Sequence, residues 1–147
     1  MEIRAATAAE APGISELFAS AGIVADGQAL ADRLAAMRQA PGATLVALQW
    51  GPPSGLVMLH WYPTLTAPRP VAQITLLLVN PEERRRGIGR LLLKAASQAA
   101  RVAGCGEMEM LAPGVSTGDD PSLGEFCRAT GFAEAGPRYV RSLRKQG

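Results

Sequence analysis

A glycine-containing loop with three adjacent arginines is the segment whose composition points most directly to chemistry. It runs Arg84-Arg85-Arg86-Gly87-Ile88-Gly89, between an apolar stretch at residues 74–79 and a helical pattern that reaches about residue 103. A helix start offers unpaired N–H groups and the positive end of the helix dipole, and glycine lets the backbone approach a ligand closely. With fixed arginine charge added, the loop predicts a pyrophosphate site.

Two other phosphate-binding loops do not match this segment. A P-loop requires Lys and then Ser or Thr after its last glycine, whereas Arg90 and Leu91 follow Gly89 here. The dinucleotide fingerprint G-x-G-x-x-G requires a third glycine, and Leu92 occupies that position. The segment therefore predicts neither of these nucleotide-binding loops.

The loop resembles the (Arg/Gln)-x-x-Gly-x-(Gly/Ala) pyrophosphate loop of the GCN5-related N-acetyltransferase (GNAT) superfamily. Arg84, Gly87 and Gly89 fill its fixed positions. The stretches Leu77-x-Val79-x-Pro81 and Phe126-Cys127-x-x-x-Gly131-Phe132 are similar to two further family patterns. The resemblance covers roughly residues 2–144. It implies acetyl-coenzyme A (acetyl-CoA) as co-substrate and N-acetylation of a primary amine, led by small-molecule amines, through direct attack in a ternary complex.

The resemblance also implies which residues bind the cofactor. Main-chain groups of Leu77 and Val79 would hold the pantetheine arm, and backbone N–H groups from about Arg86 to Arg90 would hold the pyrophosphate. Asp120 takes the place of a family Asn that contacts coenzyme A, although Asp120-Pro121 also has the form of a helix N-cap. The predicted cofactor-binding residues are Leu77, Val79, Arg84, Arg85, Arg86, Gly87, Ile88, Gly89, Arg90 and Asp120.

The general acid is an open question, because Cys127 occupies the place where many family members carry a Tyr that protonates the departing thiolate. A thiol is a weak hydrogen-bond donor. Cys127 is therefore either a catalytic residue or a small buried apolar one. Tyr139, Tyr62 and water are the alternative proton sources.

The general base is open as well, because Gln73 stands where many relatives have a Glu on the central strand. Glu109 and His60 remain as candidate catalytic bases, with ordered water as the alternative. Histidine titrates near neutral pH, which suits the deprotonation of an ammonium group. A lone histidine in an apolar strand is also commonly structural.

The hydrophobic pattern predicts the elements that position these residues. Apolar runs and turns predict strands at 2–5, 44–50, 55–62, 71–79 and 107–111, with a final strand pair at 132–133 and 139–143. Helical spacing and caps predict helices at about 10–21, 29–39, 88–103 and 121–131. Thr7 to Glu10 has the form of a capping box. Pro12 is tolerated only in the first turn of a helix, however, so a start nearer Glu10 is the alternative.

This mixed order predicts an α/β (α+β) fold in a single domain over residues 1–147. The family resemblance implies the GNAT fold in particular. That fold has a mixed, mostly antiparallel sheet, helices on both faces and a splayed parallel pair, here residues 74–79 and 107–111. Pantetheine would lie between the splayed strands.

Composition narrows the remaining classes. The chain has a net charge of +2 and its basic residues lack aromatic interleaving, so nucleic acid is not an expected partner. Two cysteines, one histidine and no C-x-x-C predict no metal site. We expect a cytoplasmic protein, because there is neither a signal pattern nor an apolar run of membrane length. A homodimer, a peptide or protein acceptor, and a non-catalytic acyl-CoA sensor remain as alternatives.

Overall fold

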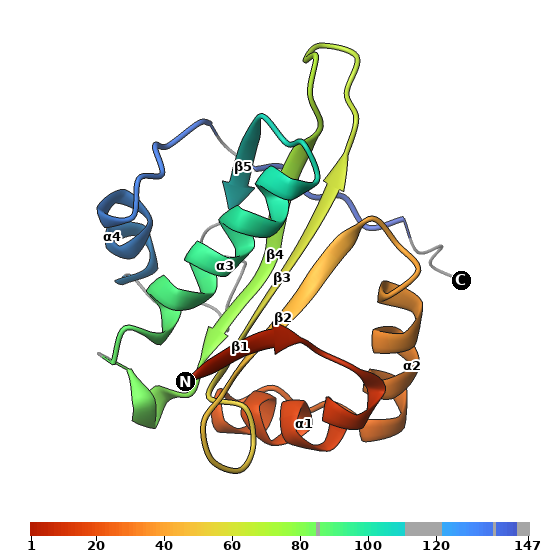
Figure 1. Cartoon of the computed structure of the whole chain (residues 1–147), viewed down its shortest axis with the longest axis vertical. Helices are drawn as coiled ribbons and strands as arrows, with labels where there is room; N and C mark the ends of the chain where they lie inside the picture. The colour runs from red at the N-terminus through yellow and green to blue at the C-terminus, as the bar shows by residue number, and fades with distance from the viewer. Residues whose placement is uncertain (85, 111–121, 137, 144–147) are drawn as a thin grey trace.

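A five-stranded mixed sheet forms the centre of the computed structural model, which describes residues 1–84, 86–110, 122–136 and 138–143. The strands lie side by side in chain order (Figure 1). They are β1 (Glu2–Ala5), β2 (Gly42–Leu48), β3 (Gly55–Tyr62), β4 (Val71–Val79) and β5 (Glu107–Met110). Strands β1 to β4 pair antiparallel, and the β4–β5 pair is parallel. The predicted fold class is confirmed.

Helices cover both faces of this sheet. Helix α3 (Ile88–Val102) packs on one face, and α1 (Ala11–Ser20) with α2 (Gly27–Met37) packs on the other (Figure 1). Alternate residues of β3 supply the two cores, because successive side chains of a strand point to opposite faces. Val57 and Leu59 face α3, whereas Leu56 and Met58 face α1 and α2.

Helix α3 forms where the sequence predicts it. Its inward stripe recurs at helical spacing and is buried against β2, β3 and β4. The stripe consists of Ile88, Leu92, Leu93, Ala96 and Ala100. The helix ends at Val102, and Gly104 follows in the left-handed region at φ +85°. Such a residue releases the chain from the helix without the strain that a side chain would add.

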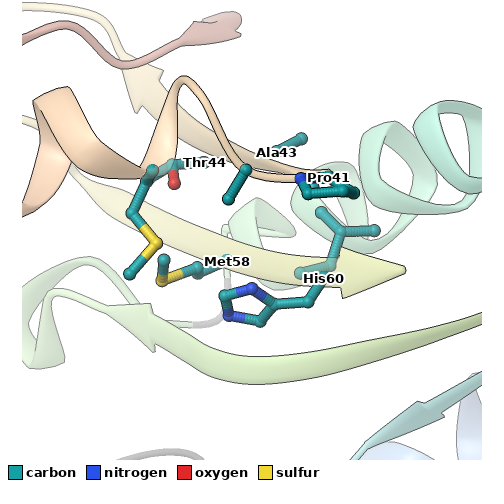
Figure 2. A pocket seen from close by; sticks show the side chains of 9 residues that line it. Pro41, Ala43, Thr44, Met58 and His60 are labelled. Carbon is teal, nitrogen blue, oxygen red and sulfur yellow. The ribbon is translucent and has the colours of Figure 1, made fainter. Parts of the chain in front are cut away.

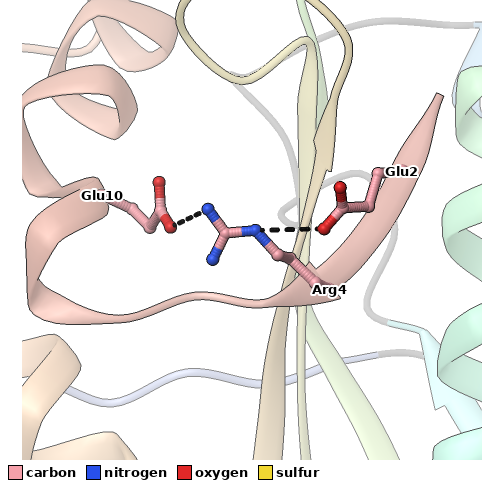
Figure 3. A network of polar contacts seen from close by, with 3 residues as sticks. All are labelled: Glu2, Arg4 and Glu10. Atoms are coloured by element: carbon pink, nitrogen blue, oxygen red, sulfur yellow. Dashed lines mark ion pairs between the residues drawn. The ribbon is translucent and has the colours of Figure 1, made fainter.

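The N-terminal capping box is not formed, and the alternative start near Glu10 is confirmed, because α1 begins at Ala11 with Glu10 at its N-cap. Thr7 precedes a 3-10 turn, η1 (Ala8–Glu10), and its side chain makes no capping hydrogen bond. Glu10 instead pairs with Arg4 at 2.6 Å, and Arg4 also lies 3.4 Å from Glu2 (Figure 3). The Glu10 side chain is only 13% exposed, so the cationic partner on β1 satisfies it better than a backbone N–H would.

Helix α2 begins two residues before the predicted start. Asp26 is its N-cap, because the Asp26 carboxylate accepts a 2.9 Å hydrogen bond from the Ala29 N–H. The Asp26 carboxylate therefore has a structural role as a helix cap.

The predicted C-terminal strand pair does not form in the described residues. Residues 132–136 and 138–143 follow α4 (Ser122–Ala129) without strand structure. Tyr139, Val140 and Leu143 are largely exposed there. An apolar segment forms a strand only when a neighbouring strand supplies backbone hydrogen bonds. Such pairing depends on residues far apart in sequence, so the local pattern does not reveal it.

Candidate active site

The predicted phosphate loop leads into the first turn of α3. Gly87 is the N-cap of this helix, in the left-handed region at φ 76° and ψ 11°. This conformation strains residues that carry a Cβ. The first hydrogen bond of the helix joins the Leu91 N–H to the Gly87 carbonyl oxygen at 3.1 Å. The N–H groups of Ile88, Gly89 and Arg90 come before it, so they have no carbonyl acceptor within the helix. A helix start of this kind suits an anion.

The loop is preceded by a short turn, η2 (Pro81–Glu83). The Asn80 side chain closes this turn by accepting a 3.0 Å hydrogen bond from the Glu82 N–H. Arg86 lies 3.6 Å from Glu83 and is mostly exposed, so this ion pair contributes little to stability. Arg84 and Arg90 are exposed as well, whereas Arg85 lies outside the described residues.

Two loop residues have packing roles beyond the backbone. Ile88 is 2% exposed and contributes its side chain to the core below α3. A Cβ on Gly89 would lie 3.2 Å from Phe126 Cζ and 3.9 Å from Val79 Cγ2. The absence of a side chain at Gly89 thus allows the Phe126 ring of α4 and Val79 of β4 to pack closely against the start of α3.

Beside this helix start, β4 has an unpaired edge. Pairing with β5 runs from Val71–Glu107 to Ile74–Met110, where β5 ends. Pairing of β4 with β3 continues to Val79, opposite Gly55. Residues 75–79 therefore have a sheet partner on one side only, among the residues that the structure describes.

The two edges of β4 can be assigned to particular residues. The Asn80 N–H donates to the Ser54 carbonyl at 2.8 Å, so Asn80 faces β3. Because alternate residues of a strand direct their N–H and C=O groups to opposite edges, Leu78 also faces β3, whereas Leu77 and Val79 face the open edge. The Leu77 side chain is buried beneath α3, which leaves its backbone as the group offered to a ligand.

A β-bulge marks the start of the open stretch. Met58 is opposite Leu76 and Leu59 is opposite Ile74, so Thr75 is an additional residue on β4. The bulge reverses the alternation of the strand: Ile74 and Leu77 both pack toward α3, while Leu76 packs toward α1 and α2. The sequence does not show where the bulge lies, nor that the Thr75 side chain lies beside β3.

Three of the residues considered for proton transfer lie in one row across the sheet. His60 on β3 is opposite Gln73 on β4, and Gln73 is opposite Glu109 on β5. Directly paired residues share a face, and His60 follows Met58 by two residues. The row therefore lies on the face that α1 and α2 cover, away from α3. We call it the acceptor face.

Two further contacts complete the acceptor face. His60 Nε2 lies 3.1 Å from Thr75 Oγ1. Tyr62 occupies the next row, where burial and then the negative charges of Glu109 and Glu107 raise the pKa of its phenol. The phenol consequently stays protonated at neutral pH.

A small hollow opens on this face between the end of α2 and strands β2 and β3. Met58 and His60 project into it from β3 (Figure 2). The rest of its wall consists of Met37, Ala40, Pro41, Gly42, Ala43, Thr44 and Leu59. The hollow is too small to hold a water molecule, so it is only a shallow depression beside the imidazole.

Cys127 lies elsewhere, under the sheet on the α3 side. Its side chain is buried on α4, and its Sγ–H donates to Met110 Sδ at 3.5 Å. Burial raises the pKa of the thiol, and the nearby Arg128 charge opposes this only in part. The thiol is therefore neutral and packed against the last residue of β5.

The structure thus separates the predicted residues into two groups. Gly87, Ile88, Gly89, Arg90, Leu77 and Val79 adjoin the open β4 edge, and Cys127 packs nearby against Met110. His60 and Glu109 share the acceptor face. Asp120 lies outside the described residues. Sequence reasoning missed Thr75, because an ordinary threonine in an apolar run carries no signal of a bulge.

Neither a cluster of metal ligands nor a membrane span occurs in the described part of the chain. No group of three or more His, Cys, Asp or Glu side chains lies close enough together there to hold a metal ion. Within the same residues, no helix combines the length and apolar character needed to cross a membrane.

Comparison with solved structures finds the same fold repeatedly. A protein described as an acetyltransferase from Agrobacterium tumefaciens str. C58 is 28% identical, with a TM-score of 0.79 over 97% of this chain and 100% of that chain. A Trypanosoma brucei acetyltransferase is 23% identical, with a TM-score of 0.80 over 97% and 99%. An aminoglycoside N-acetyltransferase in complex with CoA is 20% identical, with a TM-score of 0.80 over 98% and 95%.

Sequence comparison gives the family directly. No curated protein matches the chain significantly. The acetyltransferase (GNAT) family, however, matches residues 12–132, a span that includes the β4 edge, the phosphate loop and α4. The chain therefore belongs to the acetyltransferase (GNAT) family and is an N-acetyltransferase.

Proposed function

We propose that the protein transfers the acetyl group of acetyl-CoA to a primary amine of a small molecule, by direct attack in a ternary complex. One observation carries this proposal. Among the described residues, the edge of β4 that is without a strand partner runs from Thr75 to Val79 and continues into the first-turn N–H groups of α3. An extended ligand that ends in a pyrophosphate matches such a combination of strand edge and helix start.

The residues present fit coenzyme A. Backbone groups of Leu77 and Val79 would pair with the amides of the pantetheine arm. The N–H groups of Ile88, Gly89 and Arg90 would bind the pyrophosphate, with arginine side chains from Arg84 to Arg90 adding positive charge. When bound, the cofactor supplies an activated thioester. The chain's part is to orient it and to manage protons on the acceptor side.

Proton removal from the acceptor belongs, in this proposal, to the acceptor face. His60 and Glu109 are the two side chains there that can act as a general base. Cys127 is the less suitable acid, because its thiol is buried against Met110. Tyr62 keeps its phenolic proton, since its pKa is raised, and is the alternative donor.

Small-molecule amines are the favoured acceptors in this proposal, as the family resemblance implies. The hollow beside His60 is too small to hold a ligand in this conformation, so it does not select the acceptor. A structural neighbour, an aminoglycoside N-acetyltransferase, was determined with a bisubstrate analogue of CoA and acetylneamine. A peptide acceptor and a non-catalytic acyl-CoA sensor are the alternatives. We also propose that nucleic acid is not a partner, and that any self-association is a homodimer.

The test follows thiol release from acetyl-CoA with a panel of amines, together with calorimetric binding of coenzyme A. The panel contains amino acids, spermidine, tyramine, neamine and a peptide with a free N-terminus. We expect turnover on a small amine. Binding without turnover on any amine would favour the sensor, and preference for the peptide would favour the protein-directed alternative.

Gly87→Glu is the site-specific variant in the same assay. It puts bulk and negative charge at the helix start, so we expect binding of coenzyme A to be lost. Gly104→Glu is the matched control, because Gly104 also has a positive φ, at the other end of α3, and a Cβ there would meet no atom within 4 Å. Unchanged affinity in folded Gly87→Glu would refute the pyrophosphate site.

A further inference from the structure

The Thr75–His60 contact lies at the closed end of the open β4 edge. Within the described chain, the open stretch begins at Thr75, directly after the β4–β5 pair Ile74–Met110. If the pyrophosphate binds at the start of α3, beyond Val79, the arm runs back along the strand toward Thr75. The thioester, at the far end of the arm, then lies near the point where β4 and β5 separate. This placement rests on the proposed function.

At that point Thr75 is better placed than His60 to meet an acceptor amine. Thr75 is on β4, which borders the opening, whereas His60 is on β3, one strand spacing of about 4.8 Å farther away. The bulge turns Thr75 toward the acceptor face, where Oγ1 is 3.1 Å from His60 Nε2. Both residues are half-buried, so the contact is shielded from bulk water on one side.

We propose that Thr75 and His60 form a proton relay for the acceptor amine. Thr75 Oγ1–H donates to His60 Nε2, so the neutral imidazole carries its own proton on Nδ1. One proton of the ammonium group passes to Thr75 Oγ1 while the threonine hydroxyl proton passes to Nε2. Thr75 is then restored and His60 becomes an imidazolium.

The remaining steps balance the transfer. The freed nitrogen lone pair forms the N–C bond to the acetyl carbon as the C–S bond breaks, and that bond's electron pair leaves on sulfur. A second proton of the amine ends on the thiol, and the third remains on the amide. The imidazolium releases its proton to solvent, which resets the relay.

Tyr62 on β3 and Glu107 and Glu109 on β5 are ionisable groups in or beside this row. Glu2 and Arg4 of β1 lie on the same face at the opposite edge of the sheet, where Arg4 pairs with Glu10. Glu109 is the rival base. It is exposed at the sheet edge and separated from His60 by the whole width of β4, with Gln73 between them. From β2 and the end of α2, the neighbours Met37, Pro41 and Thr44 are uncharged.

The first experiment reads the imidazole tautomer by nitrogen-15 NMR of the ligand-free protein. His60 is the only histidine in the chain, so its signals need no assignment. We expect the neutral ring to carry its proton on Nδ1 in the wild type and in Thr75→Ser. Thr75→Val keeps the side-chain shape but lacks the hydroxyl, and the proton should shift toward Nε2. A wild-type ring protonated on Nε2 would overturn the relay.

The second experiment measures kinetics with the most active amine of the panel. Thr75→Val and His60→Gln should each lower kcat about a hundredfold, the low end of general-base contributions, with the KM for acetyl-CoA unchanged. Thr75→Ser should recover kcat to within about threefold of the wild type. The double variant should be no slower than either single one, because the two residues act as a unit.

Three outcomes would count against the relay. A Glu109→Gln variant with a larger kcat loss than His60→Gln would move the base to β5. Thr75→Val with an altered KM but unchanged kcat would reduce Thr75 to a structural role. A wild type that binds coenzyme A but turns over no amine would overturn the relay's function together with the proposed reaction, even with the Nδ1 tautomer present. If the wild type is active but the variants do not show the expected kcat losses, the relay is wrong and the proposed function still holds.

Discussion

At the scale of single residues, the glycines of the loop have different physical roles. Gly87 is required by its backbone, since it takes a positive φ although a Cβ there would meet no atom within 4 Å. Gly89 is required by its neighbours, since a Cβ there would meet the Phe126 ring at 3.2 Å. The family pattern requires both positions to be small, but only the structure separates conformation from packing.

Gly89→Ala should destabilise the protein in a way that Phe126→Leu relieves. Crowding against the ring costs about 1–3 kcal/mol, whereas alanine in a helix gains up to about 1 kcal/mol over glycine. We expect a net loss in the wild-type background and a gain in the Phe126→Leu background. Urea unfolding of the four proteins in this double-mutant cycle measures the coupling, and additive changes would show that the ring does not constrain Gly89.

Cys127→Ala should lower the rate less than tenfold, because the thiol packs against Met110. Burial raises the pKa of this thiol, so the folded state holds its proton more tightly than the unfolded state does. The free energy of unfolding should therefore fall as pH rises past the ordinary thiol range, near about 8.5, and Cys127→Ala should fall less steeply. Unfolding midpoints from pH 7 to 10 test this slope. A rate loss above a hundredfold would give Cys127 a chemical role.

At the scale of elements, β4 combines two functions that its sequence does not distinguish. Its side chains fill cores on both faces, with Leu77 toward α3 and Leu78 toward α1 and α2. Over residues 75–79 its backbone is paired on one edge, and on the other edge it has no strand partner in the part of the chain that the structure describes. The Thr75 bulge lies at the boundary, so it ends the parallel pairing and turns a hydroxyl toward His60.

Val79→Pro should weaken coenzyme A binding without unfolding the sheet. Proline lacks the N–H that Val79 directs to the open edge, and a strand tolerates proline where that group faces no ladder partner. Loss of one hydrogen bond, about 1–1.5 kcal/mol, corresponds to roughly tenfold in affinity.

The matched control is Val79→Ala, which shortens the same side chain and keeps the N–H. Calorimetry on both variants separates the two effects. Equal affinities for coenzyme A would show that the Val79 N–H is not used in binding.

At the scale of the whole molecule, stability depends on how closely the helices approach the sheet. Gly55 allows the closest contact of this kind between β3 and α3. A Cβ at Gly55 would lie 2.9 Å from Leu92 Cδ1 and 3.0 Å from the Leu78 carbonyl oxygen. The same contact sets the distance between α3 and the end of β4, and therefore the geometry of the proposed cofactor site.

Gly55→Ala should lower the free energy of unfolding by about 1–3 kcal/mol, because α3 must move or the core must strain. Gly27→Ala is the control with the same chemical change. Gly27 opens α2, and a Cβ there meets nothing within 4 Å, so this variant should be neutral or slightly stabilising. Chemical denaturation with intact coenzyme A binding as a second readout tests both. Equal stabilities would show that α3 does not depend on this contact.

Features that depend on near neighbours along the chain were readable from the amino-acid sequence. The apolar run of β4, the turn and arginine-glycine loop after it, and the amphipathic stripe of α3 are all of this kind. Hydrophobic periodicity and glycine chemistry report such features directly, and the same segments carried the correct family resemblance. The fold class followed from the order of these elements.

Contacts between strands, in contrast, emerged only once the chain was folded. The pairing register placed His60, Gln73 and Glu109 in one row, and a one-residue bulge brought Thr75 to His60. In the folded chain Glu10 forms an ion pair with Arg4 and no capping box. Residues 139–143 have no strand partner in the described chain. These outcomes depend on hydrogen bonds and charges between segments far apart in sequence, which no local pattern encodes.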